Sequence, residues 1–583
     1  MKYKERRRDS FSETIEYTRK RRNHRSLSQE LDFFETATLY ICRHILTQDA
    51  GFRKETSLDR FFSSLASREE IAQLITSIKR RINSYILKNN LNEADVAGFT
   101  MKSDQWMVSY YILSRLKEMN PDITIVIGGL SNESQGRVFM QAFNEVDFAI
   151  WGEGEYPLAQ LISVLEEGTP LEKVPHLIYR DGATIHSSRR ETARADLDSY
   201  PFADHSDYFD TLKAVSRMTE IVGNVFIPIW GSRSCPWSKC KFCVLKEEYP
   251  YRARSPENIV EEIKFQAEKH HVEKFYFLDN ELPGTKRRFM SLLKLLVEVS
   301  ADKTHHYAFC GEVSPIFIDS ETAQYMHDAS FLSVQIGFEA LTDSLLEKME
   351  KRHRFAHNIQ ALKLSSQHDL NLISLNVLRG IPTETSGDIM ESCDNLRFLR
   401  FLLTTHALVP IWLLLCKGST FYEEMSEAER EAWRFHRTYM EIASTGLIPQ
   451  SDRFEFFGFF RGSPHELWED FEERMESCIK ANHSYTWTEY ENCSLVEEKG
   501  PEFLRYTLDR DETDVLIFCD LIKSFSELKE EFHYLGELRL AEILSRLKKA
   551  GLMYYDGDMR TIISILEACR REIVTSRFVP RHP

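Results

Sequence analysis

Three cysteines lie close together near the middle of the chain, at Cys235, Cys240 and Cys243. Their spacing, Cys-x4-Cys-x2-Cys, places three soft thiolate ligands in one loop, and such ligands suit zinc or an iron–sulfur centre. A closed structural zinc site uses four protein ligands. The next cysteine along the chain is Cys310, so no fourth ligand lies nearby in the sequence. Three thiolates on a four-iron cluster would leave one iron open to another molecule.

The cysteine spacing alone leaves two other interpretations open. The three residues could form a zinc knuckle with a distant fourth ligand, or they could be reduced thiols that bind no metal. The segments on either side of the cysteines can distinguish these interpretations, because a catalytic cluster needs a fold that brings other polar groups to the same place.

Strand-like and helix-like segments alternate after the cysteines. Ser255 and Pro256 are typical of a helix start, and the pattern predicts a helix that ends near His270. A second helix is predicted over residues 286–299. Strands are predicted at residues 274–278, 306–309, 331–336 and 372–378. Repeated strand–helix units over about 200 residues predict a full or partial β/α barrel.

Polar residues and glycines follow the predicted strands, where such barrels place their chemistry. They are Asp279, Asn280, Gly311, Glu312, Gln335, Gly337, Glu339, Asn376, Gly380 and Pro382. Each residue has an ordinary alternative: Asp279 could cap the next helix, Glu312 and Glu339 could be salt-bridged rim residues, and Asn376 could be a buried amide. Their order at successive strand ends favours one shared site.

The region before the cysteines also alternates between strand and helix. Residues 30–90 are predicted to be helical. Strands are predicted at residues 94–100, 123–127 and 146–150, with helices at 106–119 and 135–143. This order implies a parallel, doubly wound α/β sheet, whose ligands bind at the carboxyl ends of the strands. Those ends carry Gly98, Thr100, Gly128 and Gly129, and glycine lets a bulky ligand approach the backbone.

The cysteine segment resembles the cluster loop of radical S-adenosylmethionine (radical SAM) enzymes, which have an aromatic residue before the last cysteine, as Phe242 is here. The usual spacing in that family is Cys-x3-Cys-x2-Cys, so the extra residue between Cys235 and Cys240 departs from it. The resemblance implies a partial barrel of six units. It also implies that the three cysteines hold a [4Fe-4S] cluster whose open iron binds S-adenosylmethionine (SAM).

The same resemblance implies roles for the strand-end residues. Glu312 and Gly311 would meet the methionine amino group of SAM, and Asn376 would reach its ribose. The residues implied to bind cofactors in this domain are Phe242, Asp279, Gly311, Glu312, Gln335, Glu339 and Asn376. Gly380 and Pro382 match a turn beside the adenine.

Three segments before the cysteines, residues 98–100, 128–129 and 152–155, together resemble the cobalamin-binding domain that precedes many radical SAM cores. The resemblance implies that Gly98, Thr100, Gly128 and Gly129 lie against cobalamin. The sequence has no Asp-x-His-x-x-Gly motif, so cobalamin would bind base-off without a histidine ligand. The first strand of such a domain is not evident, because residues 1–30 are polar. The alternative is a Rossmann-like domain with a structural role only.

Four regions are predicted in total. They are a helical N-terminal region (1–90), a Rossmann-like domain of the cobalamin-binding type (91–200), a partial barrel (220–425) and a mainly helical C-terminal region (426–583). Three helices at 516–522, 525–532 and 538–550, followed by a turn between two short strands, resemble a winged-helix module at about 510–570. In peptide-maturing enzymes such modules help to engage the substrate.

More specifically, residues 128–132, followed by 146–147 and 152–155, resemble enzymes that mature ribosomally synthesised peptides (RiPPs). This resemblance implies a cobalamin-dependent C-methyltransferase that uses a 5′-deoxyadenosyl radical and methylcobalamin to methylate an unactivated carbon of a peptide. A one-electron reductant such as flavodoxin or ferredoxin would be a partner. No catalytic acid–base pair is assigned. Two alternatives stay open: a peptide cyclase or epimerase without methyl transfer, and a non-catalytic, metal-stabilised binding protein.

Charge and composition argue against several classes of protein, namely nucleic-acid-binding, membrane-spanning and secreted proteins. The net charge of −16 argues against broad nucleic-acid binding. No run of 18 or more apolar residues occurs, which predicts no membrane-spanning helix. The N-terminus lacks the apolar core of a secretory signal and most cysteines are scattered, so we expect a reducing, cytoplasmic location.

Overall fold

The computed structural model describes residues 67–102, 105–188, 196–214, 225–245, 250–301, 305–403, 408–435, 459–461 and 466–578. The predicted helical region before residue 67 lies outside these residues. The chain divides into two compact units. The first comprises residues 1–194, 247–249 and 414–460, and the second comprises residues 195–246, 250–413 and 461–583. No described helix is both long enough and apolar enough to cross a lipid bilayer.

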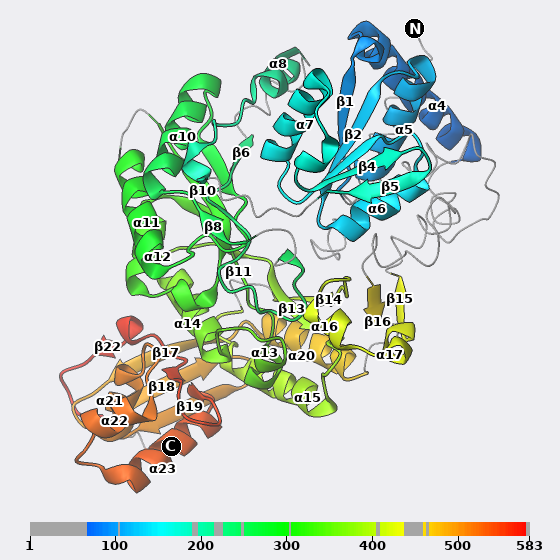
Figure 1. The fold of residues 1–583 in the computed structure, drawn as a ribbon. Helices are drawn as coiled ribbons and strands as arrows, with labels where there is room; N and C mark the ends of the chain where they lie inside the picture. The colour runs from blue at the N-terminus through cyan, green and yellow to red at the C-terminus, as the bar shows by residue number, and fades with distance from the viewer. Residues whose placement is uncertain are drawn as a thin grey trace. The chain divides into compact units, whose positions relative to one another are not determined.

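The first unit is built on a five-stranded sheet with the order β1-β2-β3-β4-β5 (Figure 1). Its strands are β1 (Val96–Thr100), β2 (Thr124–Leu130), β3 (Phe148–Trp151), β4 (Leu177–Asp181) and β5 (Thr184–Ser187). The first three strands are parallel, and β4 and β5 are added antiparallel. Its helices include α4 (Arg68–Lys88), α5 (Gln105–Met119), α6 (Glu133–Ala142) and α7 (Glu155–Glu167).

Helices cover both faces of this sheet. Successive strand residues point to opposite faces, so the residues that a helix contacts show which face it covers. Helix α7 packs with Leu161 against Val126 and Ile150. Helix α6 approaches the other face, where a Cβ on Gly136 would touch Ala149. The predicted doubly wound α/β arrangement is therefore confirmed for the described residues.

The second unit contains a five-stranded parallel sheet with the order β12-β11-β10-β9-β6. Its strands are β6 (Phe226–Ile229), β9 (Lys274–Phe277), β10 (Ala308–Val313), β11 (Phe331–Ile336) and β12 (Leu372–Ile373), and a further parallel pair is β13 (Leu375–Arg379) with β14 (Leu408–Trp412). The helices around them are α8 (Ser206–Ala214), α10 (Pro256–His270), α11 (Lys286–Ser300), α12 (Ser320–Asp328), α13 (Asp343–Lys348), α14 (Phe355–Gln367) and α15 (Ser386–Asn395).

Strands β12 and β13 occupy one position of a partial barrel. The sequence pattern predicts a single strand here, but Ser374 has a φ of +50°, and this left-handed residue bends the chain between the two pieces. Strand β11 pairs with β12, and a parallel bridge between Glu339, which follows β11, and Val377 of β13 continues this pairing. Counting β12 and β13 together, the described strands supply six positions, as expected for the predicted partial barrel.

The C-terminal module (residues 484–573) has a four-stranded sheet with the order β19-β18-β17-β22. Its elements are β17 (Ser484–Glu489), β18 (Ser494–Lys499), β19 (Phe503–Leu508), α21 (Arg510–Phe518), α22 (Phe525–Glu531), α23 (Gly536–Lys549), β20 (Met553–Tyr555), β21 (Ile562–Ser564) and β22 (Glu572–Ile573). Helix α20 (Leu467–Ala481) precedes it. The predicted three helices and hairpin are present, while strands β18 and β19 were not predicted. The first helix was predicted too far along the chain, because Asp509 and Glu512 form a capping box that starts it at Arg510.

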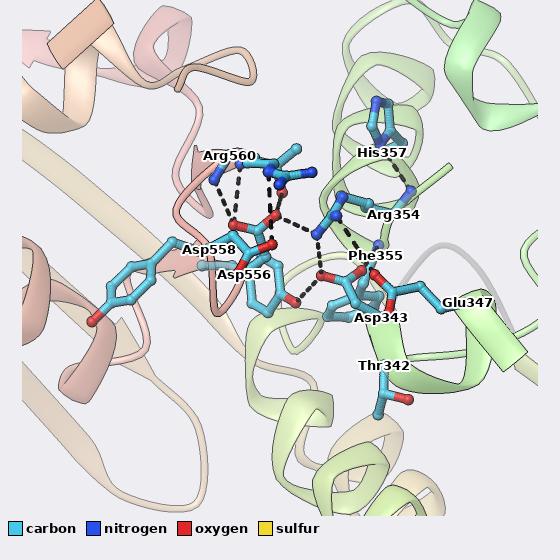
Figure 2. Close-up of polar contacts among 12 residues, drawn as sticks. Thr342, Asp343, Glu347, Arg354, Phe355, His357, Asp556, Asp558 and Arg560 are labelled. Carbon is cyan, nitrogen blue, oxygen red and sulfur yellow. Dashed lines mark hydrogen bonds and ion pairs between the residues drawn. The ribbon is translucent and has the colours of Figure 1, made fainter. Parts of the chain in front are cut away.

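Polar contacts anchor the C-terminal module to the barrel within the second unit (Figure 2). Arg354, which caps the start of α14, donates to the Asp556 carboxylate at 2.7 Å. The Tyr554 hydroxyl donates to Asp343 at 3.3 Å. Lys363 of α14 is buried and donates to three backbone carbonyls and to the Asp520 carboxylate of the module. The module is therefore a fixed part of this unit.

Candidate functional site

The cysteine loop (residues 231–243) begins after β6. Its first residues form the short strand β7 (Ser232–Arg233), which pairs with β8 (Arg252–Ala253). Cys235, Cys240 and Cys243 form no disulfide, and each has intermediate exposure. Burial raises the pKa of Cys240 to about 11, and the neighbouring Cys243 and Cys235 add to this rise. The three thiols are thus close enough to influence one another.

A short segment between α13 and α14 holds the cysteine loop. We call residues 349–354 the anchor segment. The Lys241 amide donates to the Met349 carbonyl at 3.0 Å, and the Trp237 indole donates to the Glu350 carbonyl at 2.7 Å. These hydrogen bonds fasten the loop at two points between its cysteines.

The donor set of the loop fits an iron–sulfur cluster. Three thiols share one loop, and thiolates are the ligands that such clusters use. Within the described residues, no three His, Cys, Asp or Glu side chains converge on a position for a single metal ion. In a four-iron cluster each thiolate binds a different iron, so its ligands need not converge in that way.

Asp279, predicted to lie at the end of the second strand, is only 1% exposed. Its carboxylate accepts hydrogen bonds from the Gly231 amide at 2.8 Å and the Ser232 hydroxyl at 2.6 Å. Burial raises the pKa of Asp279 to about 6, although both hydrogen bonds oppose the rise. The carboxylate thus positions the start of the cysteine loop, and a direct contact with a cofactor stays a prediction.

Two predicted glutamates lie at neighbouring strand ends. Glu312 of β10 pairs in register with Gln335 of β11, and Glu339 follows β11 with a φ of +59°. Burial and the charge of Glu339 raise the pKa of Glu312. Glu339 forms an ion pair with Lys351 at 3.1 Å, and the Lys351 ammonium lies 5.6 Å from the centre of the Phe242 ring. The structure therefore gathers these strand-end residues beside the cysteine loop.

Two more predicted residues lie within strands of the barrel. Gly311 lies within β10, where an added Cβ would stand 3.3 Å from the Cβ of Phe277. Asn376 lies on β13, one residue before Val377, which bridges to Glu339. Their contacts with SAM stay predictions.

Sequence reasoning missed three charged residues of this site: Lys351, Arg352 and Glu281. Burial opposes the charge of Lys351, but Glu339 and Cys240 raise its pKa above the ordinary value. Arg352 pairs with Glu281, whose carboxylate accepts from the Cys235 thiol at 3.8 Å. The basic cluster Lys351–Arg354 shortly after Glu339 was the available signal.

In the first unit, the predicted cobalamin-facing residues lie together at the carboxyl ends of β1 and β2. Thr100 is the register partner of Gly128, and the Met101 amide donates to the Gly128 carbonyl at 2.9 Å. Gly129 has a φ of +74°, which favours glycine. A Cβ on Gly98 would meet no described atom within 4 Å, so this face has room for a ligand.

Comparison with known protein families decides between the interpretations of the cysteine loop. Residues 231–396 match the model of the radical SAM superfamily. These residues form a radical SAM domain. The match starts at the cysteine loop and includes β9 to β13, so the strand-end residues described above belong to the radical SAM domain.

Two curated relatives extend beyond the radical SAM domain. An uncharacterized methyltransferase of Pyrococcus horikoshii is 21% identical over 299 residues, which are 51% of this chain and 62% of that protein. The anaerobic magnesium-protoporphyrin IX monomethyl ester cyclase of Cereibacter sphaeroides is 23% identical over 305 residues, which are 52% of this chain and 48% of that protein. The chain therefore spans less than two thirds of the length of either relative.

A solved structure shares the fold more widely than the radical SAM domain alone. It is the radical SAM methyltransferase TsrM from Kitasatospora setae, with cobalamin and a [4Fe-4S] cluster bound. The TM-score is 0.52 at 17% identity, and the likeness covers 76% of this chain and 88% of that chain. At this identity, the likeness shows a common fold.

Proposed function

We propose that this protein is a cobalamin-dependent radical SAM C-methyltransferase whose substrate is a ribosomally synthesised peptide. The observation that carries the proposal is the cysteine loop, held next to the Glu339–Lys351 ion pair at the strand ends of a radical SAM domain. That loop has three soft donors and no fourth cysteine nearby in the sequence. When bound, the cluster supplies the electron for SAM cleavage, and cobalamin supplies the methyl group.

The residues of the radical SAM domain would bind and orient the cosubstrate. Cys235, Cys240 and Cys243 would hold the cluster. Lys351 keeps a buried positive charge beside them, and Glu339 balances that charge. Asp279 holds the start of the loop through Gly231 and Ser232, so that end of the loop is positioned without a cofactor.

Cobalamin would lie in the first unit, against Gly98, Thr100, Gly128 and Gly129. The open space beside Gly98 and the positive φ of Gly129 support this placement. The base-off mode follows from the absence of an Asp-x-His-x-x-Gly motif in the sequence. The Pyrococcus relative and TsrM are both described as methyltransferases, which supports methyl transfer as the reaction.

Anaerobic reconstitution tests the proposal. Protein loaded with iron, sulfide and cobalamin, then given SAM and dithionite, should release 5′-deoxyadenosine and add one methyl group to a peptide encoded beside its gene. The Cys240→Ala variant is the control and should do neither. Reconstituted protein that never releases 5′-deoxyadenosine would contradict the proposal.

The cyclase relative favours a second candidate, a radical SAM enzyme that cyclises its substrate without methyl transfer. Product mass separates the two functions, because a cyclised product carries no added methyl group. A flavodoxin or ferredoxin would be the reductant in either case. Replacing dithionite with either protein tests that partner.

A further inference from the structure

The chain turns sharply at Glu339, shortly after β11. The Phe338 amide donates to the Ile336 carbonyl and the Ala340 amide donates to the Phe338 carbonyl, each at 2.8 Å, so two three-residue γ-turns follow each other. Glu339 is the central residue of the second γ-turn and has a φ of +59°. A γ-turn with a positive φ is the rare and strained form, because a left-handed backbone brings Cβ close to the following carbonyl oxygen. We call residues 336–340 the Glu339 turn.

One buried side chain holds the carbonyl groups on both sides of Glu339. Asn358 of α14 donates its side-chain amide to the Phe338 carbonyl at 2.9 Å and to the Ala340 carbonyl at 3.1 Å. Asn358 is fully buried, with an exposure of 0%. Its two hydrogen bonds therefore resist rotation of the backbone at Glu339 toward a relaxed, negative φ.

A packing role alone does not explain an asparagine at position 358. Its Oδ1 atom is buried and has no hydrogen-bond partner among the residues that the structure describes. A buried polar atom without a partner costs free energy, and a leucine would fill a similar volume without that cost. The Glu339 turn supplies the reason for a carboxamide, because the group carries two amide hydrogens and the turn offers two carbonyls.

The conformation of the Glu339 turn decides where the Glu339 carboxylate lies. That carboxylate pairs with Lys351 at 3.1 Å, and a Cβ added to Gly337 would stand 3.5 Å from its Oε1 atom and 3.3 Å from the Lys351 Nζ atom. The ion pair therefore lies directly against the backbone of the turn. The Leu378 amide donates to the Glu339 carbonyl at 2.8 Å. Pairing with β13 thus holds the Glu339 carbonyl, and Asn358 holds the carbonyls on either side of it.

We propose that Asn358 is a positioning residue for SAM binding, which holds the Glu339 turn in the conformation that keeps the Glu339 carboxylate beside the cysteine loop. The proposal rests on the proposed function for the identity of the cosubstrate. A turn that is already held in place needs no rearrangement when the ligand arrives. Without the hydrogen bonds of Asn358, the turn relaxes, and the apparent affinity falls with the fraction of molecules that can still bind.

A comparison of glycine with alanine at position 339 tests the hold on the turn without any cofactor. Glu339→Gly and Glu339→Ala both remove the ion pair with Lys351, but glycine adopts a positive φ without strain. In urea unfolding of the full chain, the unfolding equilibrium constant should be about fivefold smaller for Glu339→Gly than for Glu339→Ala. When Asn358→Leu is added to both, the turn can relax, and the ratio should fall to about one. A ratio that Asn358→Leu does not change would overturn the proposal.

Equilibrium dialysis with radiolabelled SAM tests the effect on the cosubstrate. Anaerobically reconstituted protein is used without a reductant, so SAM binds but is not cleaved. Asn358→Leu should weaken SAM binding about tenfold, since roughly a tenth of the molecules would then hold the turn as binding requires. Asn395→Leu is the matched control, because Asn395 is also buried and donates to the Leu341 carbonyl at 2.8 Å, just beyond the Glu339 turn. It should bind SAM as the wild type does.

Asn358→Ser is a milder variant, because its single hydroxyl can donate to only one of the two carbonyls. It should weaken SAM binding less than Asn358→Leu does, and it replaces Asn358→Leu in both measurements if the leucine variant does not fold. Circular dichroism and iron content check folding and cluster loading. Equal SAM affinity of the wild type and the Asn358 variants would overturn this proposal alone. Wild-type protein that carries a full cluster but binds no SAM would contradict the proposed function as well.

Discussion

Asp279 carries a buried carboxyl group whose task is to hold the cysteine loop. Its pKa rises from an ordinary value of 3.8 to about 6, chiefly because burial disfavours the charged form. The native state therefore binds a proton more readily than the unfolded chain does. Stability from this group is complete below about pH 4 and is lost as the pH rises through about 6.

Asp279→Asn should remove this pH dependence. Each pKa unit corresponds to about 1.4 kcal/mol, so the rise from 3.8 to about 6 amounts to roughly 3 kcal/mol. We expect the free energy of unfolding of the wild type, relative to the variant, to fall by roughly that amount between about pH 3 and pH 7. Urea unfolding of the cofactor-free proteins measures it, and a difference that does not vary with pH would contradict the assignment.

The ion pair of Lys351 and Glu339 gives a second residue-level prediction. Both side chains are 15% exposed, so Lys351→Met leaves Glu339 as a buried charge without its partner. We expect a loss of about 3–5 kcal/mol in the free energy of unfolding. The double variant with Glu339→Gln should recover most of the loss, because neither charge then remains. Equal urea midpoints for the single and double variants would show that the pair is not coupled.

Among the elements, the cysteine loop depends on its contacts with the anchor segment. Trp237→Phe removes the indole hydrogen bond to the Glu350 carbonyl but keeps an aromatic ring beside Lys239. One hydrogen bond contributes about 1 kcal/mol, so iron should leave the reconstituted protein about five times faster in the presence of a chelator. Absorbance of the cluster follows the loss.

Trp230→Phe is the matched control, because Trp230 directly precedes the loop and its ring lies 5.0 Å from the Arg233 guanidinium, a contact that a phenyl ring also makes. It should retain iron as the wild type does. If both variants lose iron at the wild-type rate, the anchor contact does not govern cluster retention.

Element boundaries were predicted best where capping is local. Helix α10 begins at Pro256 and ends at His270, because the Ser255 side chain caps it and His271 adopts a left-handed conformation after it. Strand β11 matches its prediction because Phe331–Ile336 is mainly an apolar run. Strand β18 was missed because Glu497 and Glu498 interrupt its apolar pattern, yet Glu498 is buried against Arg400.

At the scale of the whole second unit, the anchor segment touches both functional regions. Met349 accepts a hydrogen bond from the cysteine loop, and Arg354 binds Asp556 of the C-terminal module (Figure 2). Lys363 adds a buried connection on α14. The module and the loop are therefore attached to the same stretch of chain.

Lys363→Met should loosen the C-terminal module. The side chain is 2% exposed, and its removal takes a donor from the Asp520 carboxylate and from three backbone carbonyls. The carboxylate keeps the Ala568 amide and the Leu566 carbonyl keeps the Ser564 hydroxyl, but the ammonium charge is lost. We expect a loss of about 3–5 kcal/mol and earlier proteolytic release of the module. Urea unfolding and limited proteolysis measure both effects.

Arg354→Met is the matched comparison. Asp556 also accepts hydrogen bonds from the Arg560 amide and from Thr561, so it stays satisfied without Arg354. The expected loss is therefore smaller, about 1 kcal/mol. Equal effects of the two variants would mean that burial of Lys363 is not what secures the module.

The sequence by itself determined the candidate ligand set and the alternation of strands and helices around it. Three thiols within nine residues, and strands that end in polar groups, depend only on near neighbours along the chain. The pairing of Lys351 with Glu339, of Lys363 with Asp520 and the hydrogen bonds of Asn358 to the Glu339 turn were decided by the tertiary structure. These features depend on distance and burial between residues far apart in sequence, since the strength of a charge pair and the partners of a buried amide are set only when the chain has packed.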